Sequence, residues 1–198
     1  MPQIQVSTRA GELAALSSSL SSPAELATYA TELDQLIEQG LSLGNSRYQG
    51  DVLFGSTKTN LPPFTAARDA AGRVTGVTYD GATGNGAAIS VSDSETVLPG
   101  TTGAENANLV GFINNLVALR DTLLGSPLDM AALANVRTSL NGSEDQILST
   151  VTRISSVQYR VESAVDQARE TFEALDKEFG ERVDADYAQI SMNLNRSQ

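Results

Sequence analysis

The sequence predicts a mainly α protein with a small β insertion (α+β), built as an elongated antiparallel helical bundle of coiled-coil type plus a β-rich domain. Apolar residues follow a heptad spacing near both ends of the chain, and this spacing is lost in the middle. The middle segment instead contains paired prolines, glycines and short β-prone runs. We therefore expect a helical core domain from residues 1–50 and 108–198 and a β-rich inserted domain from residues 51–107.

Two helices are predicted in the N-terminal part of the chain, up to about residue 43. One face of the first helix carries Val6, Leu13, Leu16 and Leu20. Ser22-Pro23 then interrupts the pattern, and Glu25 stands three residues after Ser22. This spacing predicts a capping box, in which the two polar side chains satisfy amide groups at the start of the second helix while Pro23 presets its φ angle.

The second helix carries a narrow apolar seam with alternating spacings of three and four residues. Its members are Leu26, Tyr29, Leu33, Leu36, Gly40 and Leu43. Gly40 either lets another backbone approach closely or simply weakens the helix, and the sequence favours neither interpretation.

Turn signals and β-prone runs alternate in the middle segment. Residues 74–79 are expected to form a strand between turns at residues 69–72 and 80–81. Residues 87–91 and 96–98 are candidates for further strands. The apolar content of the segment is too small for a large independent core.

The strongest pattern lies toward the C-terminus, after a shorter helix predicted at about residues 109–123 and a helix start signal at residues 126–129. A heptad run alternates steps of four and three residues through Ile147, Val151, Ile154, Gln158, Val161, Val165, Ala168, Phe172, Leu175 and Phe179. Beyond Phe179 the phase changes, as in a stutter that locally unwinds a coiled coil. One helix over residues 143–198 would be roughly 80 Å long, so it needs partners along its sides.

Some of these partners would come from the chain itself. The helices at residues 24–44 and 108–124 are expected to pack antiparallel on the long helix, either closing a self-contained bundle or leaving flanks for other subunits. Burial of the heptad run should hold the fold together, so Val161→Asp or Phe172→Asp should lower the melting temperature. Two i,i+4 ion pairs would add only about 0.2–0.5 kcal/mol each: Glu173 with Lys177, and Glu178 with Arg182.

Charge and composition exclude several classes of function. Lys and Arg total 13 against 24 acidic residues, and the net charge of −11 disfavours nucleic acid and anionic membranes as partners. The chain has no Cys and no His, which excludes thiolate and imidazole metal sites and His-based catalysis. A carboxylate pair or a Ser-Lys arrangement stays open but has no positive signal in the sequence, so we expect neither an enzyme nor a cofactor. No run approaches the ~18 apolar residues of a membrane span, and no cleavable signal peptide is visible.

Four segments stand out, and they include two strings that a heptad pattern alone would not supply, LFGSTK at residues 53–58 and DADYA at residues 184–188. The four segments are NSRYQGDVLFGSTKTNLPPF at residues 45–64, GRVTGVTYDG at 72–81, SVQYRVESA at 156–164, and the segment 182–198. In this order, over nearly the whole chain, they resemble the hook-associated proteins of the flagellin family. The helical core and the insertion would then correspond to the D1 and D2 domains of that family.

The resemblance implies a structural subunit of the bacterial flagellum that forms the junction between hook and filament by helix-mediated polymerisation. The partners it implies are copies of the chain, adjacent hook-associated and flagellin subunits, and an export chaperone that binds terminal segments. It also implies an extracellular location, reached by flagellar type III export without a cleaved signal peptide.

Seven residues are candidates for core or assembly contacts: Leu53, Phe54, Arg160, Val161, Phe172, Leu175 and Phe179. Leu53 and Phe54 follow a polar turn, so we expect them to fold back onto the helical seam, with a subunit contact as the alternative. Gly55 would permit a tight backbone there. The resemblance makes Arg160 a candidate for a hydrogen bond between subunits.

The terminal segments that drive polymerisation in this family have no counterpart in the sequence. We therefore expect a core fragment that is monomeric in solution. Two alternatives remain open: a filament flagellin with a short variable domain, and a secreted binding module with its site in the β insertion.

Overall fold

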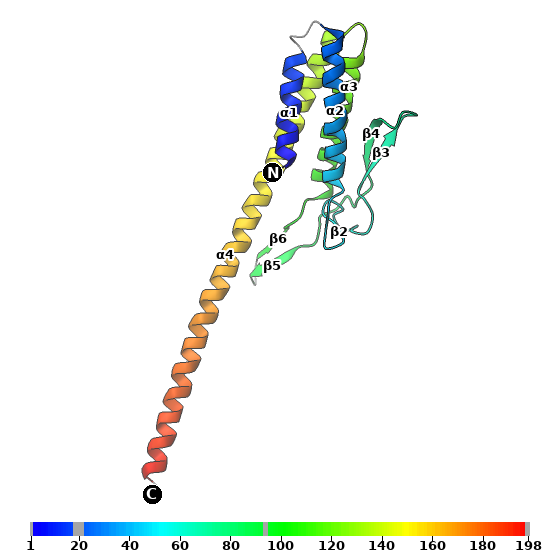
Figure 1. Ribbon diagram of the computed structural model, residues 1–198. Coiled ribbons are helices and arrows are strands. Elements are labelled where there is room, and N and C mark those ends of the chain that lie inside the picture. Colours follow the sequence, from blue (N-terminus) through cyan, green and yellow to red (C-terminus); the bar gives the residue numbers. More distant parts are fainter. Residues whose placement is uncertain (1, 18–21, 93–94, 197–198) are drawn as a thin grey trace.

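The structure is a computed structural model that describes residues 2–17, 22–92 and 95–196. The elements of this part of the chain are α1 (Pro2–Ser17), α2 (Pro23–Gly44), β1 (Arg47–Tyr48), β2 (Asp51–Val52), β3 (Phe64–Arg68), β4 (Val74–Tyr79), β5 (Ile89–Ser92), β6 (Glu95–Val97), α3 (Gly103–Leu124) and α4 (Met130–Arg196). The predicted class, mainly α with small antiparallel β elements, is confirmed. Successive helices run in opposite directions, side by side at one end of the molecule (Figure 1).

The capping box predicted at the start of α2 is wrong, although the helix begins where the sequence indicates. Ser22 is the N-cap residue and Pro23 follows it, but the Ser22 side chain makes no capping hydrogen bond. The Glu25 amide donates instead to the Ser22 carbonyl, at 3.1 Å. A complete capping box forms at α3, where the Glu105 amide donates to Thr102 Oγ1 and the Thr102 amide donates to Glu105 Oε2.

Helix α4 is uninterrupted, as the heptad run predicts, but it begins well before residue 143. Asp129 Oδ1 caps its start by accepting hydrogen bonds from the amides of Ala131 and Ala132. With 67 residues it is about 100 Å long, whereas α2 and α3 have 22 residues each. Much of α4 therefore extends beyond the other helices (Figure 1).

The core forms where the four helices overlap. Helix α3 lies at its centre and packs on both α2 and α4, while α1 packs on α2 and α4. Helix α2 thus lies chiefly on α3 and α1 rather than on the long helix, which corrects the expected arrangement. Gly40 faces Ile113 of α3, but a Cβ atom there would lie 3.4 Å from Ile113 Cγ1, an ordinary contact distance, so the packing of α2 on α3 does not require a glycine. Fully buried side chains include Leu13, Leu33, Ile37, Ile113, Leu116, Leu119 and Leu133.

The strands form three separate antiparallel hairpins, β1–β2, β3–β4 and β5–β6. The predicted strands at β4, β5 and β6 are present, whereas β1, β2 and β3 were not anticipated. Hairpin β3–β4 packs on α3, and Phe64, Val74 and Val77 belong to the same hydrophobic cluster as the helices. An isolated hairpin is only marginally stable in water, so the packing on α3 stabilises hairpin β3–β4. The division into core and inserted domains stays a prediction.

Two asparagine side chains fasten β3 and β4 to the helices. Asn45, just after α2, donates to the Phe64 carbonyl at 2.8 Å and accepts from the Phe64 amide at 3.0 Å. Asn114 of α3 makes the same pair of bonds with Val77, at 3.0 and 2.8 Å. Each amide group thereby replaces the backbone of a neighbouring strand and satisfies both polar groups of one strand residue.

A buried arginine joins the helices to the other end of β4. The Arg120 side chain, with only 1% of the residue exposed, donates to Asp34 Oδ1 at 2.8 Å and to the Val74 carbonyl at 2.7 Å. It also bonds Asp121, while Arg73 pairs with Asp34 at 3.2 Å. Because its charge is paired and its donors are occupied, Arg120 can be buried without a large penalty.

Replacing a leucine at the centre of the core should destabilise the chain far more than the same change at the surface. Leu116 is 0% exposed and Leu61 is 74% exposed. We expect Leu116→Ala to lower the free energy of unfolding by about 2–5 kcal/mol, and Leu61→Ala to change it by less than about 0.5 kcal/mol. Urea unfolding followed by circular dichroism measures both variants, and equal losses would contradict this placement of the core.

Candidate assembly surface

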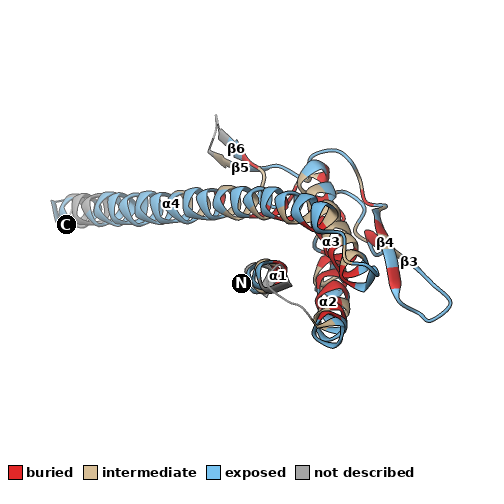
Figure 2. Cartoon of the chain, turned by 90° about the horizontal axis from the view of Figure 1, so that it is seen from above, coloured by how far each residue is buried: buried red, intermediate tan, exposed pale blue. Residues whose placement is uncertain are grey.

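Six members of the heptad run lie on the part of α4 that extends beyond the core. We call these residues the apolar stripe: Val161, Val165, Ala168, Phe172, Leu175 and Phe179. Phe172 and Phe179 are 70% and 69% exposed, and Leu175 is 60% exposed. Figure 2 shows the same change along the helix, from buried and intermediate residues near α3 to exposed residues further on.

The first members of the heptad run are covered, whereas Gln158 is already exposed. Ile147 is 8% exposed, and Val151 packs against the core. The run therefore passes from core to surface along one uninterrupted helix, at the point where its neighbours end. Large exposed apolar patches are often interaction sites, so the stripe is a candidate assembly surface.

This exposure changes what the stripe contributes to the folded chain. The expectation that Phe172→Asp lowers the melting temperature assumed burial, but Phe172 makes no core contact that the substitution could remove. Val161 is half-buried. Ion pairs on the helix surface include Arg182 with Glu178 at 2.6 Å, Arg169 with Glu173 at 3.7 Å, and Lys177 with Glu181 at 3.9 Å. Only the first of these was predicted, and as exposed pairs all three stabilise the helix little.

Leu53 and Phe54 were expected to fold back onto the helical seam, and only Phe54 does so. Leu53 is 52% exposed, so its predicted burial is wrong. Phe54 packs against the core, with its ring 6.5 Å from that of Phe64 in an edge-to-face arrangement. A Cβ atom on Gly55 would collide with the carbonyl of Lys58, which accounts for the glycine.

The Phe54 carbonyl is a buried anchor that sequence analysis missed. It accepts hydrogen bonds from Asn106 Nδ2 at 2.8 Å and from the Tyr79 hydroxyl at 3.1 Å. Asn106 is 1% exposed and also donates to Tyr79, at 3.1 Å. The segment is therefore held on α3 by its backbone rather than by Leu53.

Arg160 lies on the exposed surface of α4, directly before Val161. Its position beside the apolar stripe is compatible with a contact to another subunit, and that role stays a prediction.

A second arginine fixes the direction in which α4 leaves the core. Arg153 Nε and Nη2 donate to the two carboxylate oxygens of Glu105, at 2.5 and 2.7 Å. The same guanidinium donates to the carbonyls of Leu98 and Gly100, at 3.2 and 2.9 Å. Such a bidentate pair is geometrically demanding, so it joins α4 rigidly to the start of α3 and to the loop before it.

The Glu105 carboxylate serves two helices at once. It accepts from Arg153 of α4 and also from the amide and hydroxyl of Thr102 at the start of α3. Burial raises the pKa of this carboxyl, but the hydrogen bonds from Arg153 and Thr102 outweigh burial and leave the pKa below its ordinary value of 4.5. The ionised form therefore stabilises this junction.

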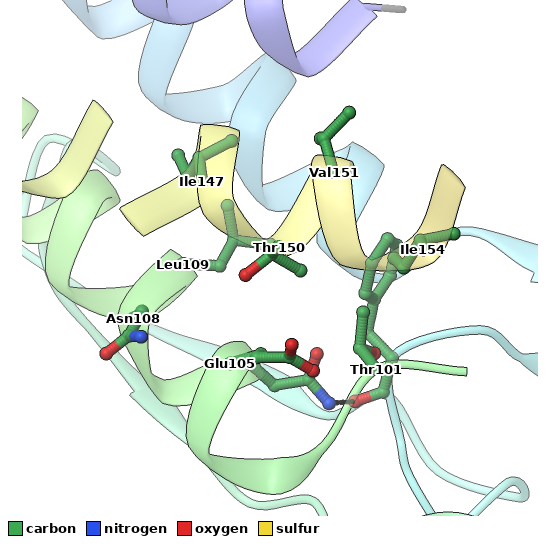
Figure 3. A pocket seen from close by; sticks show the side chains of 10 residues that line it. Thr101, Glu105, Asn108, Leu109, Ile147, Thr150, Val151 and Ile154 are labelled. Atoms are coloured by element: carbon green, nitrogen blue, oxygen red, sulfur yellow. Dashed lines mark hydrogen bonds between the residues drawn. The ribbon is translucent and has the colours of Figure 1, made fainter. Parts of the chain in front are cut away.

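An apolar pocket of about 130 Å³ lies beside this junction, between α3 and α4. Figure 3 shows Ile147, Val151 and Ile154 of α4 on one side and Leu109 and Thr101 on the other. Thr101 Oγ1 is buried without a hydrogen-bond partner. Three members of the heptad run therefore line the pocket, just before the exposed part of α4 begins.

Among the described residues, no group of three or more His, Cys, Asp or Glu is arranged to hold a metal ion. None of the helices in the described ranges is long and apolar enough to cross a membrane.

Comparison with solved structures supports the fold. The crystal structure of Bacillus cereus FlgL superposes with a TM-score of 0.71 at 22% sequence identity, covering 87% of this chain and 80% of that chain. No protein-family model matches the chain, and no curated protein sequence matches it. The chain therefore has an FlgL-like fold, as its sequence motifs indicate.

The Arg153–Glu105 junction should make stability depend on pH in the acid range. Because folding lowers the pKa of Glu105 below 4.5, its contribution is full above that value and is lost as pH falls through the lowered pKa. We expect Glu105→Gln to destabilise the chain by about 1–3 kcal/mol at pH 7, with the difference from the unmodified chain shrinking below pH 4.5.

Urea unfolding at a series of pH values measures this effect. Glu170→Gln, on the exposed surface of α4, is the matched control and should leave stability unchanged. A Glu105→Gln deficit that persists undiminished in acid would argue against the ionised junction.

Proposed function

We propose that this chain is a structural, non-catalytic subunit of the bacterial flagellum that polymerises through its helices at the junction between hook and filament. The observation that carries the proposal is the apolar stripe on α4, within a fold that is similar to Bacillus cereus FlgL. Exposing the apolar stripe of α4 to water is unfavourable in free energy for an isolated chain. Burying the stripe against other subunits removes this unfavourable exposure.

The helices would supply the assembly contacts. Each large apolar side chain of the stripe stabilises an interface by roughly 1.5–3 kcal/mol when it is fully buried. Because Arg153 holds α4 rigidly, the stripe is presented in one orientation, which lowers the entropy lost on assembly. The β-rich insertion, residues 51–107, would project outward from the helical core of residues 1–50 and 108–198 and thicken the junction.

The partners in this proposal are copies of the chain and the adjacent hook-associated and flagellin subunits, together with an export chaperone. The location would be outside the cell, on the flagellum, after export without a cleaved signal peptide. The acidic surface, with its net charge of −11, suits a role that requires neither nucleic acid nor membrane.

The role can be tested in the source bacterium by deleting the gene and complementing it. We expect the deletion strain to retain hooks, to lack filaments and to release flagellin into the medium. The unmodified gene should restore filaments. The double variant Phe172→Asp with Phe179→Asp should fail to restore them, because charged groups on the stripe oppose burial.

Gln167→Asp is the control, since it adds a charge to an exposed site on α4 outside the stripe. It should restore filaments fully. Loss of the filament itself without release of flagellin would favour a filament flagellin with a short variable domain. Normal motility after deletion would refute a flagellar role and favour a secreted binding module.

A further inference from the structure

The sequence contains the pair Asn-Gly twice, and the structure places the two pairs in different surroundings. Asn85-Gly86 lies in the loop between β4 and β5, whereas Asn141-Gly142 lies inside α4. Both asparagine residues are exposed. Glycine has no Cβ atom, so its amide nitrogen can approach the side-chain carbonyl carbon of the preceding asparagine without hindrance. The two pairs therefore have the same reactive groups but different freedom to bring them together.

The loop leaves Asn85-Gly86 free to turn. Among the described residues, neither Asn85 nor the Gly86 amide has a hydrogen-bond partner. The residue before the pair is fixed instead, because the Gly84 carbonyl accepts from Ser56 Oγ at 3.0 Å and from the Gly103 amide at 3.1 Å. The peptide group that joins Asn85 to Gly86 can thus rotate without breaking a hydrogen bond.

The pair in α4 is constrained by the helix. Residues 141 and 142 lie well inside Met130–Arg196. In an α-helix the amide of each residue donates to the carbonyl four residues earlier, along the helix axis. The amide of Gly142 is therefore directed away from the Asn141 side chain. It can reach that side chain only when the helix opens locally.

We propose that Asn85 is a site of spontaneous deamidation, and that α4 protects Asn141 from the same reaction. The Gly86 amide nitrogen attacks Asn85 Cγ and gives up its proton. A bond forms between Gly86 N and Asn85 Cγ, the bond between Cγ and Nδ2 breaks, and ammonia leaves with the proton. The product of this step is a cyclic succinimide.

Water then opens the succinimide at either of its carbonyl carbons. Cleavage between Gly86 N and Asn85 Cγ leaves an aspartate. Cleavage between Gly86 N and the main-chain carbonyl carbon of Asn85 leaves an isoaspartyl link, in which the main chain passes through the former side chain. Both products have lost one ammonia and gained one water, so a carboxylate replaces an amide. The reaction needs only water as its co-reactant.

Both products change the chain close to the start of α3. Gly86 lies beside the Thr101 backbone, since a Cβ atom on it would be 3.9 Å from the Thr101 carbonyl oxygen. An isoaspartyl link adds one carbon to the main chain between this contact and the fixed Gly84 carbonyl. The new carboxylate also adds a negative charge to a chain whose net charge is already −11. The chain would thus gain an altered, more acidic form with age, whether or not it serves in the flagellum.

Timed incubation of the purified, folded chain tests the proposal, with peptide mass spectrometry as the readout. We expect the peptide that contains residue 85 to gain about 1 Da and to separate into aspartyl and isoaspartyl forms. The rate should rise with pH, because the attacking nitrogen must lose its proton. Asn141 should react about tenfold or more slowly, since it reacts only in the fraction of molecules whose helix has opened locally.

Urea supplies a matched comparison within the same chain. Unfolding removes the different surroundings of the two Asn-Gly pairs, so both should then deamidate at similar rates. Similar rates in the folded chain, or a reaction without isoaspartate at residue 85, would overturn the proposal. A tenfold difference that persists in urea would also overturn it, because the difference would then come from neighbouring residues rather than from the fold.

Gly86→Ala tests the role of the glycine. Its methyl group would make only an ordinary contact with Thr101, and Gly86 does not have a positive φ angle, so the variant should fold normally. The methyl group hinders ring closure, so deamidation at Asn85 should slow severalfold. Gly142→Ala is the control and should leave the rate at Asn85 unchanged. Urea unfolding checks that both variants fold, and an undiminished rate in Gly86→Ala would contradict the succinimide route.

Discussion

The length of α4 relative to its neighbours determines the character of the whole molecule. A helix can bury an apolar flank only where other elements lie beside it, and α1 and α3 end well before α4 does. The same heptad run is therefore core at Ile147 and surface at Phe172. The heptad spacing continues between these positions, with Gln158 as its polar member; what changes is the availability of a neighbour. A chain with this geometry exposes apolar side chains along one helix as a direct result of its fold.

Hairpin β3–β4 is attached to the helices by polar side chains as well as by apolar contacts, and it has no core of its own. Asn45, Asn114 and Arg120 each bond the backbone of a strand. Because a two-stranded hairpin leaves backbone groups unpaired at its edges, these side chains satisfy groups that would otherwise face water or the core. Only the apolar residues Phe64, Val74 and Val77 need then reach the helices. This arrangement explains how a segment poor in apolar residues holds a defined place.

Periodicity in the sequence predicted which flank of each helix is apolar, and so it located α2, α3, α4 and the strand β4. It could not predict what covers a flank, which is why the burial of Leu53 and Phe172 and the partner of α2 were predicted wrongly. The capping box shows a similar limit, since Ser22-x-x-Glu25 has the right residues but the Ser22 carbonyl takes the amide. Arg120 and Arg153 could not be found in this way, because their partners Asp34 and Glu105 lie far away in the chain.

The bonds of Arg153 have a mechanical consequence. About 43 residues of α4 follow this side chain, an arm of roughly 65 Å at ~1.5 Å per residue. Over this length, a change of about one degree in the direction of α4 at Arg153 moves the C-terminal end of the helix by about 1 Å. A shift of this size approaches the tolerance of close side-chain packing. The position of the far end of α4 therefore depends on the Arg153–Glu105 pair together with the packing of α4 on α1 and α3.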